Sequence, residues 1–117
     1  MGQVLSVKDV FEGVAAVDVI GTSKGRGFQG VIKRHKLNSG PRAHGTKNTR
    51  EVKSVGCRTP SRIIKNMRMP GQMGNVRVTK RNLDIADMDT EHNLLLVRGS
   101  IPGANNGYVL VRKTNKK

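Results

Sequence analysis

VAAVDVIGTSKGRGFQG, residues 14–30, contains the pattern that decides the fold. Its Val-rich first part predicts a β-strand over 14–20 that stops at Gly21, because β-branched side chains favour strands and glycine interrupts them. Residues 21–30 then form a basic, Gly-rich turn. Its backbone can approach phosphates closely while Lys24 and Arg26 neutralise them. The simpler alternative is a plain hairpin turn.

Further short strands are predicted on both sides of this stretch. The candidates alternate in polarity or form apolar runs, and they lie at residues 3–7, 28–33, 75–80, 83–88, 94–98 and 108–112. Turn-forming residues fill 89–93 and 100–107, and no convincing helix is present. Short strands rich in β-branched residues predict an all-β barrel or sandwich.

The chain has 117 residues, which is enough for one domain. Residues 34–74 would be a long excursion between two strands of that domain. An insert of this size without regular structure normally argues against an assignment. The exception is a functional loop that something else orders, and the charge of this segment favours that exception.

Positive charge is concentrated in the middle of the chain. The formal net charge is +14, and residues 24–81 alone contribute sixteen bases and one acid. Residues 33–62 contain only five apolar side chains. Burial of so few cannot offset an ordering entropy of roughly 1–2 kcal/mol per residue. We therefore expect a polyanion to order this segment, and we expect the segment to be mobile without one.

Nucleic acid is the favoured polyanion. A membrane span would need about 18 or more consecutive apolar residues, and membrane-surface binding would need a basic amphipathic helix; the sequence has neither. Cations instead recur every few residues, as suits an extended arm that follows phosphates. The candidate nucleic-acid contacts are Lys24, Arg26, Lys33, Arg34, Lys36, Arg42, His44, Lys47, Arg50, Lys53, Arg58, Arg62, Lys65, Arg68 and Gln72.

Catalytic and cofactor sites are not expected. Gly25, Gly27 and Gly30 match the spacing of a dinucleotide-binding loop, but no amphipathic helix follows them. A nucleotide-dependent enzyme that uses these glycines is kept as an alternative. Cys57 is the only cysteine, and it does not form a metal-ligand spacing with the histidines at 35, 44 and 92. We therefore expect no enzyme activity, no metal, no cofactor and no small-molecule substrate.

Three separated blocks occur in the order found in one known family. They read VDVIGTSKGRGFQGVIKR at 17–34, MPGQMGNVRVT at 69–79 and NLLLVRGSIPGA at 93–104, with shorter matches at 43–45 and 59–60. With these blocks the chain resembles, over nearly its whole length, the L3 family of large-subunit ribosomal proteins, of the bacterial or organellar type.

The resemblance implies a single translation-protein-type β-barrel domain over 1–117, with residues 34–74 as an extended loop that penetrates rRNA. The inner tip of the loop, near 55–60, would point toward the peptidyl-transferase centre. The resemblance further implies binding near the 3′ region of the large rRNA, support of subunit assembly, and ribosomal proteins L14 and L19 as neighbours. It places the protein in the ribosome, in the cytoplasm or in an organelle matrix.

The chain departs from the family pattern at three places. The family opens with further strands, including a Gly-Met-Thr stretch, ahead of the point where this sequence starts; a barrel that does not close without them would have an open edge, which invites pairing with another chain. Arg58 precedes Thr59 where many bacterial members carry a glutamine that can be methylated, so methylation is not expected here. His35 stands where the family often has tryptophan, so a stacking contact is not carried over.

Charge and resemblance together predict a structural constituent of the large ribosomal subunit that binds rRNA. The alternative is a nucleic-acid-binding protein that is indifferent to sequence, such as a DNA-compacting protein. Such a protein would share the charge but not the ordered blocks.

Overall fold

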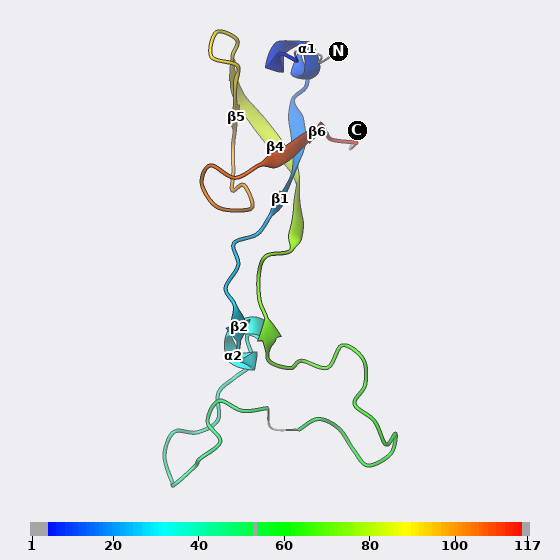
Figure 1. Ribbon diagram of the computed structural model, residues 1–117, viewed down its shortest axis with the longest axis vertical. Helices are drawn as coiled ribbons and strands as arrows, with labels where there is room; N and C mark the ends of the chain where they lie inside the picture. The colour runs from blue at the N-terminus through cyan, green and yellow to red at the C-terminus, as the bar shows by residue number, and fades with distance from the viewer. Residues whose placement is uncertain (1–4, 53, 116–117) are drawn as a thin grey trace. The chain divides into compact units, whose positions relative to one another are not determined.

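The polypeptide divides into two compact units. Unit 1 contains Met1–Lys24 and Asn75–Lys117, and unit 2 contains Gly25–Gly74. The computed structural model describes residues 5–52 and 54–115 (Figure 1). In chain order the elements are α1 (Val7–Phe11), β1 (Ala16–Thr22), β2 (Phe28–Gln29), α2 (Val31–His35), β3 (Gly71–Gln72), β4 (Arg77–Asp89), β5 (Leu94–Val97) and β6 (Val109–Lys113).

Unit 1 is built on an antiparallel four-stranded sheet with the order β5-β4-β1-β6. The buried strand β1 therefore lies between β4 and β6, and β5 and β6 form the edges. Apolar side chains on or near these edges are exposed, among them Leu94, Leu96, Tyr108 and Leu110. The predicted all-β class is confirmed, and over the described residues the sheet is open.

The apolar core of unit 1 forms on one face of β1. Val17 and Val19 are fully buried there, and Phe11 of α1 packs against them. Helix α1 begins after Ser6, whose hydroxyl oxygen accepts a hydrogen bond from the backbone N–H of Asp9 at 3.2 Å. The partly buried side chains around this cluster are those of Val7, Val10, Val14, Leu83, Ile85, Met88, Leu95, Val97 and Val111.

The opposite face of β1 carries a buried carboxylate, Asp18, which is 4% exposed. It lies at a β-bulge, where β4 has one residue more than β1, and Asn82 at the bulge has a left-handed backbone (φ 57°). One oxygen of Asp18 accepts the N–H of Asn82 at 3.0 Å, and the other accepts Nη2 of Arg112 on β6 at 3.1 Å. Asp18 thereby links β1 to both neighbouring strands.

Gly21 in β1 permits a close approach of the chain before β6. A Cβ atom at this position would lie 2.7 Å from the backbone oxygen of Pro102 and 3.2 Å from a methyl group of Val109. Backbone atoms cannot give way as a side-chain end can, so only glycine fits. The prediction that the strand stops at Gly21 is therefore wrong, because β1 continues through Gly21 to Thr22.

Unit 2 contains short regular elements at the start and end of its sequence. β2 pairs antiparallel with β3, which joins Phe28 to Gln72 and Gln29 to Gly71, and α2 follows directly after Gly30. Between α2 and β3, residues 36–70 form neither helix nor strand over their described part. This segment is called the arm.

Several sequence predictions are corrected by these elements. The prediction of no helix is wrong, because α1 and α2 are helical, although each has only five residues. The strand expected at 28–33 ends at Gln29, and α2 takes its second half. In the range 3–7, residues 3–4 lie outside the described residues and Val7 begins α1. The strands expected at 75–80 and 83–88 are one strand, β4, which contains the bulge.

The other predicted strands are confirmed. Those expected at 14–20, 94–98 and 108–112 correspond to β1, β5 and β6 with shifts of one or two residues at their ends. The turn expected at 89–93 joins β4 to β5. Its Asp89 carboxylate accepts the N–H groups of Glu91 at 2.9 Å and His92 at 3.3 Å.

We expect the Asp18 link to make unit 1 less stable in acid. The N–H of Asn82, and then the guanidinium of Arg112, hold the pKa of Asp18 below its ordinary value. The stabilisation is therefore complete above about pH 4, the range of an unperturbed aspartate, and is lost as pH falls through the lower folded-state pKa. Asp18→Asn should lower the melting temperature at pH 7, and the gap to the wild type should shrink in acid.

Circular dichroism melts between pH 7 and pH 2.5 would measure this effect. Asp84→Asn is the control, because Asp84 is exposed on the same sheet and forms no ion pair within the described part of the chain. A gap between Asp18→Asn and the wild type that does not change with pH would contradict the prediction.

Candidate nucleic-acid interface

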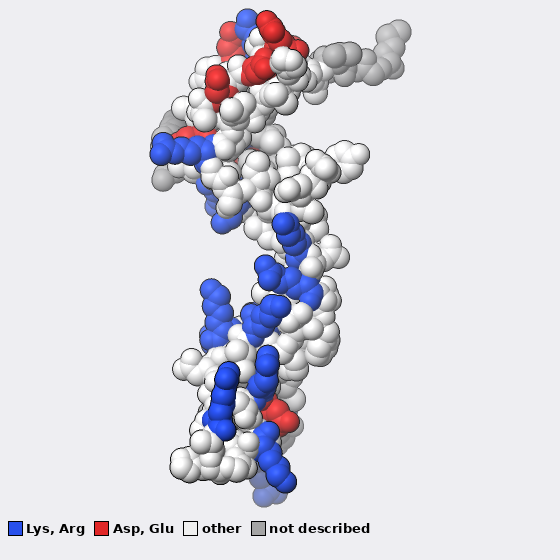
Figure 2. Space-filling model, turned by 90° about the vertical axis from the view of Figure 1, so that its left-hand side faces the viewer, with Lys and Arg blue, Asp and Glu red and all other residues white. Residues whose placement is uncertain are grey.

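Unit 2 carries most of the protein's excess positive charge. Its fifty residues include twelve Lys and Arg residues and one acid, Glu51, which gives a formal charge of +11. Figure 2 shows basic side chains spread over this unit, whereas acidic ones gather on unit 1 near α1 and the β4–β5 turn. The position of the charge therefore agrees with the arm as the candidate interface.

Most of the predicted contact residues are exposed. In unit 2 the exposed ones are Arg26, Lys33, Lys36, Arg42, His44, Lys47, Arg50, Arg58, Arg62, Lys65, Arg68 and Gln72, and Lys24 is exposed in unit 1. Lys53 lies outside the described residues, and Arg34 is half-buried. No described Lys or Arg of unit 2 lies within 4 Å of a carboxylate oxygen. This positive charge is thus available to an external anion.

Backbone hydrogen bonds join the two stretches of chain from which the arm begins and ends, and this joined region is called the base of the arm. Besides the β2–β3 pair, the N–H of Arg26 donates to the carbonyl of Met73 at 2.9 Å, and the N–H of Met73 donates to the carbonyl of Gly27 at 2.9 Å. The two limbs of the chain therefore run antiparallel through the glycine-rich turn. The hairpin alternative for residues 21–30 is wrong, because this segment does not fold back on itself but pairs with residues 71–76.

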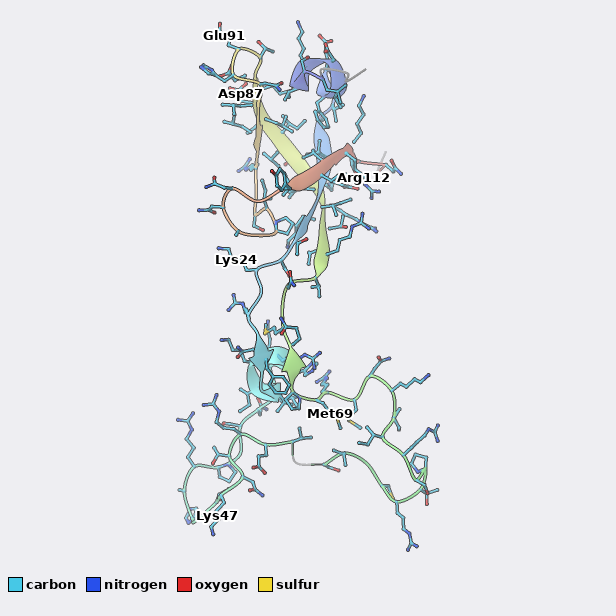
Figure 3. All side chains as sticks on the ribbon, viewed as in Figure 1. Lys24, Lys47, Met69, Asp87, Glu91 and Arg112 are labelled. Carbon is cyan, nitrogen blue, oxygen red and sulfur yellow. The ribbon has the colours of Figure 1, made fainter. Side chains whose placement is uncertain are left out.

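Helix α2 clamps the returning limb by two side chains. Nη1 of Arg34 donates to the carbonyl oxygen of Met69 at 2.7 Å, and Nε2 of His35 lies 3.0 Å from the same oxygen. Figure 3 shows Met69 beside α2, just before β3. Arg34 also fills the space over Gly71, because a Cβ atom there would lie 2.8 Å from its Nη1. Arg34 therefore forms a hydrogen bond within the protein in addition to carrying a positive charge.

The arm itself has few internal bonds. The N–H of Gly40 donates to the carbonyl of Thr49 at 2.9 Å and closes one loop, in which Figure 3 shows Lys47 at the turn. Local turns at 58–61 and 64–67 contain the other backbone hydrogen bonds of its described residues. An arm with so few bonds can adapt its shape to a partner.

The structure does not favour the alternative of a dinucleotide site. The strands pair only antiparallel over the described residues, and α2 after Gly30 has five residues. A dinucleotide fold needs parallel strands joined by a longer helix, with the phosphates at the N-terminus of that helix. Among the residues that the structure describes, no group of three metal-ligating side chains comes together, and no helix is long and apolar enough to span a membrane.

Sequence reasoning missed the clamp on Met69. Arg34 and His35 belong to a run of basic residues, and nothing in that run distinguishes an internal donor from a free cation. The acceptor is a backbone carbonyl at residue 69, which has no sequence signature.

We expect loss of the Arg34 contact to loosen the base of the arm. A charged donor on a carbonyl contributes about 1.5–3 kcal/mol, and His35 remains on the same oxygen, so the loss should lie at the lower end of that range. Arg34→Gln should therefore speed hydrogen exchange at the amides of Arg26 and Met73 by about tenfold. Amide exchange followed by NMR would measure this.

Lys33→Gln is the matched control, since it removes the same charge from the preceding, exposed residue. It should leave both exchange rates within about twofold of the wild type, because surface substitutions usually change stability by less than about 0.5 kcal/mol. Equal acceleration in the two variants would assign the effect to charge and refute the clamp.

Comparison with known proteins agrees with the resemblance in the motif blocks. The family model for ribosomal protein L3 matches residues 1–91. Among curated proteins, the chain is 54% identical over 109 residues to large ribosomal subunit protein uL3 of Syntrophobacter fumaroxidans, which covers 92% of this chain and 52% of that protein. The chain is also 53% identical to uL3 of Thermotoga petrophila and 49% identical to uL3 of Brevibacillus brevis, covering 95% and 100% of this chain.

The chain spans about half the length of these relatives, between 52% and 56% of each. The matched part contains the Gly-rich turn and the arm, together with β1, β4 and the pairing between these two strands. A family model that covers 91 of 117 residues extends across both units. The chain belongs to the ribosomal protein L3 family.

Proposed function

We propose that the protein is an rRNA-binding structural constituent of the large ribosomal subunit. The observation that carries this proposal is the arm, which is irregular over its described part and whose described cations lack carboxylate partners. The names of the relatives, large ribosomal subunit protein uL3, supply the particle. In that particle the chain acts as one domain, in which residues 34–74 form the rRNA-penetrating loop.

Binding is driven by neutralisation of phosphates. Each Lys or Arg that contacts a phosphate releases condensed counterions, so affinity falls steeply with salt. The exposed cations of the arm, with Lys24 and Arg26 in the preceding turn, supply these contacts. The contacts of Arg34 and His35 with Met69, and the pairing of β2 with β3, hold the two ends of the arm together. The site is near the 3′ region of the large rRNA, with the tip directed toward the peptidyl-transferase centre, and the protein supports subunit assembly.

Protein neighbours are proposed for unit 1. The edges β5 and β6 expose apolar side chains, and their outer sides pair with no strand among residues 5–52 and 54–115, so other chains can cover these surfaces. Ribosomal proteins L14 and L19 are the neighbours that the family resemblance implies. The longer relatives contain parts that this chain does not match, and such parts are another candidate for covering these edges.

The alternative is a binder indifferent to sequence, because charge alone produces nonspecific affinity for any nucleic acid. Titration of the chain with the 3′-terminal domain of large-subunit rRNA, a structured RNA of equal length and duplex DNA separates the two. We expect tighter binding to the rRNA, with a preference that persists at high salt. Equal affinities that collapse together with salt would favour the alternative.

A pair of matched variants locates the binding surface. Arg58→Gln with Arg62→Gln removes two exposed cations from the arm, and Arg98→Gln with Lys113→Gln removes two exposed cations from unit 1. The first double variant should flatten the dependence of log affinity on log salt by about two, at about one per lost phosphate contact. The second should leave the slope nearly unchanged. The reverse result would move the interface to unit 1.

The arm is predicted to become ordered when it binds RNA. In the free protein its described backbone has few hydrogen bonds, so the amides of 36–62 should exchange with solvent much faster than those of β1. Bound rRNA should slow exchange across the arm. Uniform protection of these amides in the free chain would contradict the prediction, and β1 serves as the internal standard.

A further inference from the structure

Unit 2 contains an open groove of about 630 Å³. It lies between the α2 region, with Val31, Leu37 and Asn38, and two stretches of the arm at 51–54 and 64–68, of which Lys53 is not described. Its volume falls in the range of about 300–1,000 Å³ that is usual for small-molecule sites. All of its lining residues belong to unit 2.

The floor of the groove is apolar. Val31 is 2% exposed, Leu37, Val52 and Met67 are half-buried, and Ile64 remains 55% exposed. Residues 33–62 contain only five apolar side chains, and two of them, Leu37 and Val52, line this one groove. The arm thus presents an apolar surface to solvent in this groove, and burial of such a surface by a ligand is favourable.

The groove also contains the only acid of unit 2. Glu51 is exposed, and its carboxylate makes no hydrogen bond or ion pair with any described residue. An ionised carboxylate can only accept hydrogen bonds, so its ligand must present donors. Lys65 and Arg68 line the same groove and can bind an anionic group of that ligand.

These three properties select the ligand. An acidic peptide would meet Glu51 with like charge, and a basic ligand would be repelled by the +11 charge of the unit. An unstacked nucleotide presents a flat apolar face, an amino group on its base and a phosphate. Single-stranded bases of RNA are recognised in this way, through their faces and their hydrogen-bonding edges.

We infer that this groove takes an unpaired nucleobase of the bound RNA, and that Glu51 accepts a hydrogen bond from the exocyclic amino group of that base. The inference rests on the proposed function and deepens it, since it adds base recognition to phosphate contacts. Cytosine carries such an amino group, and a carboxylate accepts from it. Uracil has a carbonyl oxygen at that position, which the carboxylate repels.

Octacytidylate and octauridylate are therefore a matched pair of probes, because they have equal length, charge and ring size. The full chain should bind octacytidylate about tenfold more tightly than octauridylate, as measured by fluorescence anisotropy at low salt. Glu51→Gln should abolish that preference, because an amide can donate to the carbonyl of uracil as well as accept from cytosine.

The sign of the Glu51→Gln effect separates this inference from simple electrostatics. Removal of a negative charge from a polyanion-binding surface ordinarily tightens binding, and the control Glu91→Gln, at the exposed β4–β5 turn of unit 1, should do so slightly for both probes. Glu51→Gln should instead weaken octacytidylate binding while octauridylate binding rises. Ile64→Ser should weaken both probes by a similar factor and keep their ratio, since it removes only an apolar contact.

Equal affinity of the wild-type chain for the two probes, or tighter binding of octauridylate, would overturn the inference. So would the absence of measurable binding to either probe. Self-association in sedimentation, combined with equal probe affinities, would assign the groove to a second copy of the chain. If the rRNA preference persists in titration while the two probes bind equally, only the groove assignment fails; loss of the rRNA preference alone would refute the proposed function.

Discussion

Repulsion among the cations of unit 2 is the constraint on which the rest of the structure depends. Twelve bases and one acid within fifty residues cannot pair among themselves, and few apolar side chains are present to draw the chain together. Regular structure in this segment is accordingly confined to its start, with β2 and α2, and to its end, with β3. Backbone hydrogen bonds of β2 and β3 require no side-chain core, and two side chains of α2 then secure one carbonyl, that of Met69.

Unit 1 differs from unit 2 because it forms an apolar core, although it does so from few buried residues. Strand β1 supplies most of it, because Val17 and Val19 are buried on one face while Asp18 links the neighbouring strands on the other. A buried carboxylate is tolerable only when it is fully hydrogen-bonded. The bulge at Asn82 provides one donor and the register with β6 provides Arg112. The irregularity of β4 therefore serves to satisfy the buried carboxylate of Asp18.

The sequence predicted the parts of the fold that depend on pattern. Alternation and apolar runs located β1, β5 and β6, and charge density located the arm. The two helices were missed because five residues are too few to show a helical period. One long strand was predicted as two because Asn82 adopts a left-handed backbone that side-chain periodicity does not reveal. The contact of Arg34 and the role inferred for Glu51 both depend on which atoms face these side chains, and a linear run of charges carries no such information.

Affinity and selectivity have separate sources in such a molecule. Cations along the arm attract any polyanion, and phosphates look alike in every sequence, so additional lysines raise affinity without adding discrimination. An acid in the same surface weakens the attraction for phosphates. This loss is offset only where the carboxylate accepts a hydrogen bond from a base, because phosphate groups offer it no donor. Glu51 lines a groove of the arm together with apolar side chains, against which the face of a base can be buried. In the proposed function, charge brings RNA to the arm, and in the further inference the single carboxylate distinguishes among its bases.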